Sequence, residues 1–402
     1  MTAPRQMALG AFLMATGHPL AGWRHPGAHA AGGLDVEHYR ALARTAERGC
    51  FDAIFLSDTL AMLPGRLDAL SRMARTEHFE PLTLLAHLAV STRHIGLVAT
   101  VTSSYNDAAN VADTFATLES LSGGRSGWNL VTSSNAEEAG NFGRDRHYEH
   151  ACRYRMAEDF LQRVRERWTA RGVAPVQVLA GASEAGRELA ARQAEVLFTA
   201  QPELAGAQAF YRDIKQRVAR HGRDPDALKV MPGVLPILGA SRAQADEHRA
   251  QLQELVQPVV GLSLLSDVAG GFDLSPWPLD GPLPELPPTE SGVSRQHLLL
   301  DLARREGLSI RQLYQRIAAA RGHRVVAGTA ADIADQLQAW FESGAADGFN
   351  IMPPYLPGGL DDFVAQVVPQ LQRRGVFRRR YSGTTLRDHL GLAHSKEVAL
   401  HG

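Results

Sequence analysis

The chain has 402 residues, of which 45% are hydrophobic, and a formal net charge of −1. This hydrophobic fraction supports a large globular core, and the near-neutral charge argues against nucleic acid or an anionic membrane as the main partner. Residues 1–20 lack a basic segment followed by a long apolar one, which argues against a signal peptide. No run approaches the roughly 20 apolar residues of a membrane span. Cys50 and Cys152 show no paired spacing, so we expect two unpaired thiols in a cytoplasmic protein.

Apolar strands alternate with helices along the first half of the chain. The predicted strands, each a short apolar run, cover 6–13, 52–58, 94–101 and the segment around Trp128 and Val131. The predicted helices cover 35–48, 81–90, 110–121 and 147–168. Asp35 suits the N-cap of its helix and Pro81 suits a first helical turn.

The second half of the chain repeats this alternation. Its predicted strands cover 176–181, 195–200, 229–238 and 348–353, and its predicted helices cover 184–193, 203–221, 241–256, 310–320 and 331–342. Eight nearly all-apolar strands alternating with helices predict an α/β protein with a (β/α)8 TIM barrel. A doubly wound open sheet is the alternative, which the lack of a GxGxxG motif after any strand disfavours.

We predict a single barrel domain over residues 1–402 with two additions. Residues 270–288 interrupt the alternation with Pro and Gly, so we expect an insertion at about 257–309 that lies over the surface or over a site. Residues from about 373 to 402 are basic at first and irregular. We expect this C-terminal extension to pack on a neighbouring subunit.

The loops that follow the strands should build the active site, as in other barrels of this type. Asp58 is the only carboxylate directly at this rim, so a paired-carboxylate or two-metal hydrolase is poorly supported. No His-Glu-x-x-His spacing occurs, and we predict no metal site. The rim positions are the 18–25 loop, Asp58, Thr102, Ser103, Thr132 to Asn135, Gly181, Ser183, Gln201, Pro353 and Pro354.

A ring of hydroxyl groups around an apolar floor suits a large, flat, uncharged ligand with one anionic arm. Ser183 precedes a helix and could offer its hydroxyl and the first helical amides to a phosphate, with the Tyr154 phenol beside it. The alternatives are an ordinary N-cap for Ser183, a packing role for Tyr154 and a loop cap for Asp58. His18 and Trp23 share the first rim loop and are either substrate-facing or structural.

The segment Ser-Gly-Gly-Arg-Ser-Gly-Trp-Asn-Leu-Val-Thr-Ser at 122–133 resembles the signature of the bacterial luciferase-like flavin monooxygenases. Within them it is similar to the nitrilotriacetate monooxygenase group, whose large subunits act on aminopolycarboxylates, dibenzothiophene sulfone and pristinamycin. The resemblance covers nearly the whole chain. Its other segments are 17–19, 21–26, 80–85, 94–100, 153–154, 180–183, 347–350 and 357–360.

The resemblance implies a TIM barrel that binds reduced FMN delivered by a separate NAD(P)H:flavin reductase. It also implies that O2 oxygenates a small organic substrate, such as an aminopolycarboxylate or organosulfur compound, and that the subunits form a homodimer or homotetramer. Carried over to this chain, the resemblance implies that Asp58 and Thr102 lie beside the isoalloxazine and that Thr132 and Ser134 lie along the flavin and ribityl chain. It implies that Tyr154, Ala182 and Ser183 bind the phosphate, and that His18 and Trp23 face the substrate.

The chain departs from the family in one connection. Members carry a long segment between the helix near Trp168 and the strand near Val176, whereas only residues 169–175 lie there in this chain. That segment lies near the flavin opening. Serine also stands near Ser134 where some relatives have histidine, so no acid–base role is assigned to this position.

Three other functions compete with a monooxygenase. They are a flavin-binding relative without oxygenase activity, a deazaflavin-dependent dehydrogenase, and a barrel isomerase or aldolase. The last would need a lysine at the end of a strand, but Lys229 opens its strand. An aminopolycarboxylate substrate would call for cationic pocket residues such as Arg24, and an aromatic sulfone for Phe and Trp.

Overall fold

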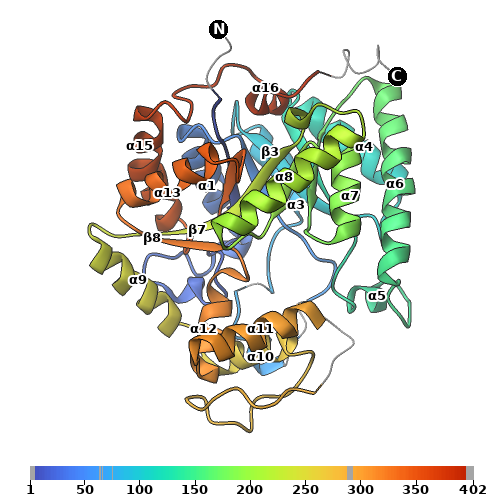
Figure 1. The fold of residues 1–402 in the computed structure, drawn as a ribbon. Helices are drawn as coiled ribbons and strands as arrows, with labels where there is room; N and C mark the ends of the chain where they lie inside the picture. Colours follow the sequence, from blue (N-terminus) through green and yellow to red (C-terminus); the bar gives the residue numbers. More distant parts are fainter. Residues whose placement is uncertain (1–4, 63–64, 66, 75, 288–292, 395–402) are drawn as a thin grey trace.

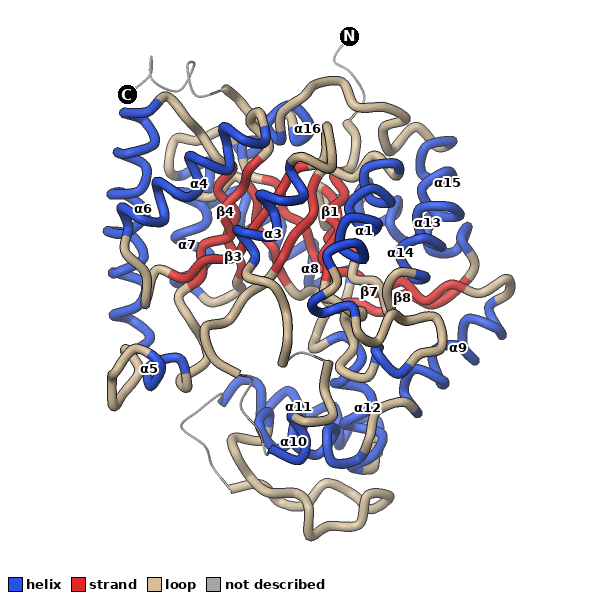
Figure 2. The backbone as a smooth tube through the Cα atoms, turned by 180° about the vertical axis from the view of Figure 1, so that it is seen from behind, coloured by secondary structure: helices blue, strands red, loops and turns tan. Residues whose placement is uncertain are grey.

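The computed structural model describes residues 5–62, 65, 67–74, 76–287 and 293–394. Eight parallel strands close a central barrel that is surrounded by helices (Figures 1 and 2). These strands are β1 (Ala8–Leu13), β2 (Ala53–Leu56), β3 (Gly96–Thr102), β4 (Ser126–Val131), β5 (Val176–Ala180), β6 (Val196–Thr199), β7 (Lys229–Leu238) and β9 (Gly348–Ile351). The ring closes because β9 pairs with both β7 and β1. The predicted TIM barrel is confirmed.

A ninth strand, β8 (Arg324–Gly328), was not predicted. It pairs with Val234–Leu238, the carboxyl half of the ten-residue β7, while β9 pairs lower on β7, at Gly233 and Val234. The long strand β7 therefore pairs with β9 near its middle and with β8 along its carboxyl half. The prediction missed β8 because its apolar run is short and the strand is only partly buried.

The helices cover the outside of the barrel, and several begin at the expected caps. The Asp35 carboxylate accepts bonds from the first amides of α1, and Glu80 caps the helix that starts at Pro81 in the same way. The helices are α1 (Val36–Arg48), α2 (Leu67–Leu70), α3 (Pro81–Ala89), α4 (Ala108–Ser122), α5 (Glu138–Asn141), α6 (His150–Arg171), α7 (Glu184–Gln193), α8 (Leu204–Arg220), α9 (Arg242–Glu254), α10 (Pro258–Val268), α11 (Val293–Glu306), α12 (Ile310–Ala320), α13 (Ala330–Glu342), α14 (Gly358–Asp362), α15 (Val368–Arg373) and α16 (Leu386–Leu390).

Helices α10, α11 and α12 lie together beyond the carboxyl ends of the strands (Figures 1 and 2). They share an apolar cluster of their own, in which Leu265, Leu313 and Tyr314 are buried. Helices α10 and α11 fall within the stretch that we expected to be an insertion, and neither helix was predicted. This group of helices therefore faces the mouth of the barrel, where the active-site loops lie.

Within the described residues the C-terminal extension packs on its own chain, and its expected contact with a neighbouring subunit stays a prediction. Within the described residues it crosses the amino end of the barrel, opposite α10–α12 (Figure 1). Leu386 and Leu390 of α16 are buried among apolar residues of the barrel interior, such as Val98. Arg378 forms an ion pair with the buried Asp52. The extension thus closes the barrel at this end.

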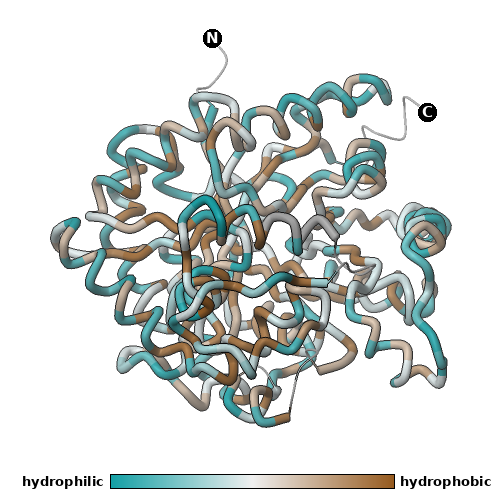
Figure 3. The backbone as a smooth tube through the Cα atoms, turned by 60° about the horizontal axis from the view of Figure 1, so that its bottom comes forward, coloured by the Kyte–Doolittle hydropathy of each residue, from teal (hydrophilic) through white to brown (hydrophobic). Residues whose placement is uncertain are grey.

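The most hydrophobic segments lie inside the molecule and hydrophilic segments lie around them (Figure 3). Both cysteines are free; Cys50 is buried and Cys152 is half-buried, as expected. Among the described residues, no helix combines the length and the apolar character needed to cross a bilayer.

Candidate active site at the mouth of the barrel

Aromatic rings form the floor of the barrel mouth. Phe12, Phe55 and Phe198 come from three different strands and pack with ring centroids 4.7–5.6 Å apart. His18 lies 5.3 Å from Phe12, and His323 stacks on Phe198 at 5.0 Å. Burial lowers the pKa of His323 to about 4, so its ring is neutral at pH 7. The three Phe rings and the neutral His323 ring therefore form an apolar floor, as expected from the apolar strands.

A chain of hydrogen bonds joins the loops after β2, β3 and β4. The Thr102 hydroxyl lies 2.7 Å from the Ser133 hydroxyl, which donates to one oxygen of Glu138. The other Glu138 oxygen accepts a bond of 3.1 Å from Thr59. Glu138 is only 3% exposed. Sequence reasoning missed Glu138, because nothing in the spacing separates it from its exposed neighbour Glu137.

Ser133 adopts a left-handed backbone conformation, with φ at 54°, which is unusual for a residue other than glycine. Its carbonyl oxygen accepts hydrogen bonds from Arg153 of α6 and from His147 Nε2, the latter at 3.0 Å. Since His147 Nε2 donates there, its Nδ1 is the acceptor for the Tyr105 hydroxyl at 2.6 Å. These bonds hold the turn that follows β4. They also direct Arg153 to backbone carbonyls, although it precedes the predicted phosphate residue Tyr154.

Tyr154 and Ser183 meet at the amino end of α7. Their hydroxyl oxygens are 3.1 Å apart, and Ser183 also accepts a bond from the Gly186 amide as the N-cap of the helix. A Cβ atom at Gly186 would lie 3.1 Å from each hydroxyl oxygen, so glycine leaves room for this pair. Ala182 and Ser183 are exposed. Two hydroxyl groups beside exposed first-turn amides are a donor set that suits a phosphate.

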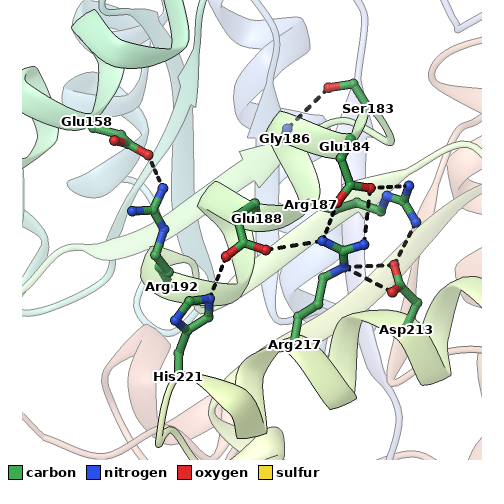
Figure 4. A network of polar contacts seen from close by, with 10 residues as sticks. All are labelled: Glu158, Ser183, Glu184, Gly186, Arg187, Glu188, Arg192, Asp213, Arg217 and His221. Carbon is green, nitrogen blue, oxygen red and sulfur yellow. Dashed lines mark hydrogen bonds and ion pairs between the residues drawn. The ribbon is translucent and has the colours of Figure 1, made fainter.

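Glu184 is next to this donor set, and its negative charge is offset by two arginines (Figure 4). Its carboxylate forms ion pairs with Arg187 on the same helix and with Arg217 on α8. Both arginines also form ion pairs with Asp213, and Arg217 pairs further with Glu188. The acidic first turn of α7 is therefore compatible with a bound anion.

Asp58 lies at the edge of a cavity of about 230 Å³. One of its oxygens accepts bonds from the Thr59 amide at 2.8 Å and from His78 at 3.3 Å. The hydrogen bond to Asp58 raises the pKa of His78. The rest of the lining consists of residues at or after the ends of β1 and β2 (13–17, 56, 57 and 59) and of Tyr39, Ala74, Glu77, Phe79, Pro81, Leu84 and Arg321.

The remaining predicted residues are more dispersed. Thr132 is half-buried and Ser134 is exposed on the turn after β4. Trp23 is half-buried and donates to the Arg72 carbonyl at 3.3 Å, and it is absent from the described lining of the cavity. Arg24 is exposed and donates to the Leu255 carbonyl.

Comparison with known proteins identifies the family. Residues 16–347 match the profile described as luciferase-like monooxygenase. The chain belongs to this family. Nitrilotriacetate monooxygenase component A of Aminobacter aminovorans is 44% identical, with 98% of each chain covered. The structure of EDTA monooxygenase from Chelativorans sp. BNC1 is 30% identical, covers 97% of this chain and 99% of that one, and has a TM-score of 0.77. A riboflavin lyase structure with modified FMN and riboflavin is 26% identical over 97% of each chain, with a TM-score of 0.82.

These matches confirm the family that the 122–133 segment and its companions indicated. The alignment with the Aminobacter relative runs over 446 positions, more than the 402 residues of this chain. That relative therefore carries residues that this chain lacks. In this chain, α6 ends at Arg171 and β5 begins at Val176, so their connection is short, as the sequence indicated.

Proposed function

We propose that this chain is the oxygenating component of a two-component monooxygenase. It would take reduced FMN from a separate NAD(P)H:flavin reductase and use O2 to oxygenate a small organic substrate. The observation that carries the proposal is the pairing of Tyr154 with Ser183 at an exposed helix start, on the same barrel mouth as an aromatic floor. A flavin mononucleotide has these two ends, a phosphate and a flat apolar ring system.

The site residues divide by the part of the flavin that they would contact. Bound reduced FMN supplies the electrons and the centre at which O2 reacts. Tyr154, Ala182 and Ser183 would hold the phosphate through hydroxyl and amide donors, and Thr132 and Ser134 would follow the ribityl chain. Asp58 and Thr102 would border the ring system, with Thr102 positioned by the Ser133–Glu138 bonds.

The side of the site that faces the substrate would be formed by His18 and Trp23. The buried floor around Phe12 and Phe198 would exclude water from the ring system, which protects a reactive reduced cofactor from side reactions. The neutral His323 ring adds no charge there at pH 7. This chain's own contribution is therefore binding, orientation and exclusion of water.

We further propose a cytoplasmic homodimer or homotetramer built from one barrel domain over residues 1–402. Within that domain, 257–309 would be the insertion and 373–402 the C-terminal extension. The free Cys50 and Cys152 fit a reducing compartment.

The proposal is tested by isotope incorporation in a reconstituted system of this chain, a flavin reductase, NADH, FMN and 18O2. Nitrilotriacetate and dibenzothiophene sulfone serve as probes. We expect one labelled oxygen atom in the product of at least one probe, and none when the chain or the reductase is left out. Oxidation of reduced FMN with no label in either product would favour the flavin-binding relative without oxygenase activity. Turnover of a reduced deazaflavin under nitrogen would favour the dehydrogenase.

A further inference from the structure

Arg321 stands where a glycine or asparagine would be favoured. It caps the carboxyl end of α12 with φ at 49° and ψ at 42°, a left-handed conformation that is unfavourable for most side chains. The next residue, Gly322, also has a positive φ, of 88°. A large side chain kept in an unfavourable backbone conformation often has a function that depends on that side chain.

The Arg321 side chain lines the cavity beside Asp58, together with Met14, Thr16 and His78. Helix α12 belongs to the helices beyond the barrel mouth (Figure 1), so Arg321 brings a cation from that group of helices to the mouth. The Asp58 carboxylate is itself bonded to His78. No carboxylate of the described lining pairs with Arg321.

The guanidinium of Arg321 makes no hydrogen bond and no ion pair within the described part of the chain. Its Nε atom is buried without an acceptor. Burial lowers the pKa of Arg321, and the exposed Asp267 offsets this only in part. Arg321 is half-buried, and a cation in such a place with no acceptor among the described residues is unfavourable unless a ligand supplies one.

Arg125 provides the contrast within the same molecule. It is 3% exposed, and its side chain donates to the carbonyls of Ser122, Ile95 and Ala89 and to the Thr92 hydroxyl. Every side-chain nitrogen atom of this buried structural arginine therefore has a hydrogen-bond acceptor. At Arg321, no acceptor for the guanidinium occurs among the described residues.

We infer that Arg321 binds a carboxylate of the substrate, so that the preferred substrates are small organic acids. The planar guanidinium can hold both oxygens of one carboxylate, which a lysine cannot do with the same geometry. This inference rests on the proposed function, because it assumes that the cavity beside Asp58 belongs to the substrate side of the flavin site, next to the loop that carries His18 and Trp23.

The test is calorimetric titration of the protein, with oxidised FMN present, by nitrilotriacetate and by its uncharged trimethyl ester. We expect the acid to bind wild type roughly tenfold or more tightly than the ester. Arg321→Asn should abolish this preference, and Arg321→Lys should keep part of it. Arg316→Gln removes an exposed arginine of the same helix and should behave as wild type. Because asparagine tolerates the left-handed conformation, Arg321→Asn should unfold thermally at the wild-type temperature or above it.

Equal affinity of wild type for acid and ester would overturn the inference, as would an unchanged preference in the folded Arg321→Asn variant. Titration with FMN alone separates the two proposals. A wild-type protein that binds no FMN contradicts the proposed function. A protein that binds FMN without preferring the acid contradicts only the role of Arg321.

Discussion

Charged side chains at the two ends of the barrel differ in how many partners they have within the chain. At the amino end, Asp52, Arg125 and Asp347 stand directly before β2, β4 and β9. The Asp52 carboxylate accepts from the Leu9 amide and pairs with Arg378. Asp347 pairs with Lys215 at 2.9 Å and accepts from the Val230 amide at the same distance. These charges are satisfied by groups of the chain itself.

At the mouth, some polar side chains of the described residues lack hydrogen-bond partners within the chain or are exposed. The guanidinium of Arg321 makes no hydrogen bond among the described residues, and the Tyr154–Ser183 pair is exposed. Stabilising interactions at the amino end of a barrel and incomplete ones at the carboxyl end are the arrangement expected of an enzyme of this fold. The comparison predicts that substitutions at the amino end change stability and that those at the mouth change binding.

The largest effect is expected at Asp347. Asp347→Ala leaves Lys215 buried without its partner and should lower the free energy of unfolding by about 3–5 kcal/mol. Urea denaturation followed by circular dichroism measures this loss. Asp335→Ala removes the exposed carboxylate that pairs with Arg374 and should cost less than about 1 kcal/mol. Equal losses in the two variants would mean that burial of the Asp347–Lys215 pair adds nothing to its contribution to stability.

An intermediate effect is expected at His323, and it depends on pH. The pKa of His323 is about 4 in the folded protein, against 6.5 for the ordinary side chain. Between these values the unfolded chain binds more protons than the folded protein. His323 therefore lowers the free energy of unfolding as the pH falls from 6.5 toward 4. His323→Phe keeps a ring beside Phe198 and should reduce this acid-dependent loss by about 1–3 kcal/mol.

Urea denaturation of wild type and His323→Phe at pH 7 and at pH 4.5 measures this difference. The comparison between the two proteins cancels the other titrating groups. A loss of the same size in both proteins would mean that His323 is charged in the folded state.

The smallest effect is expected at Arg24, which sequence reasoning offered as a cationic pocket residue. Its side chain is exposed and donates to the Leu255 carbonyl. Arg24→Gln should change the free energy of unfolding by less than about 1 kcal/mol and leave the preference for nitrilotriacetate over its ester unchanged. Loss of that preference in this variant would indicate that the carboxylate binds at the 18–25 loop and not at Arg321.

The barrel could be predicted from the sequence because its eight closing strands are strongly apolar and alternate with capped helices. Strand β8 escaped prediction because its apolar run is short and it pairs with only the carboxyl half of β7. Helix α10 escaped because its sequence is apolar nearly all round, which leaves no periodic face to recognise.

The rim residues could be predicted because loops after parallel strands meet at one end of a barrel. The partners of those residues could not. Glu138 and Glu137 look alike in sequence, and only the fold buries Glu138 beneath Ser133 and Thr59. Arg321 reads as an ordinary basic residue at the end of a helix, where it would favour the helix dipole. Only the three-dimensional structure reveals that no described residue accepts a hydrogen bond from its guanidinium.

Anaerobic titration with reduced FMN tests most directly whether the barrel mouth is a flavin site. Wild type should bind reduced FMN tightly, and Ser183→Ala and Tyr154→Phe should each weaken binding roughly tenfold or more. Thr385→Ala removes an N-cap hydroxyl of α16 at the amino end of the barrel and should leave binding unchanged. No binding by folded wild type, or equal binding by all four proteins, would contradict the flavin site.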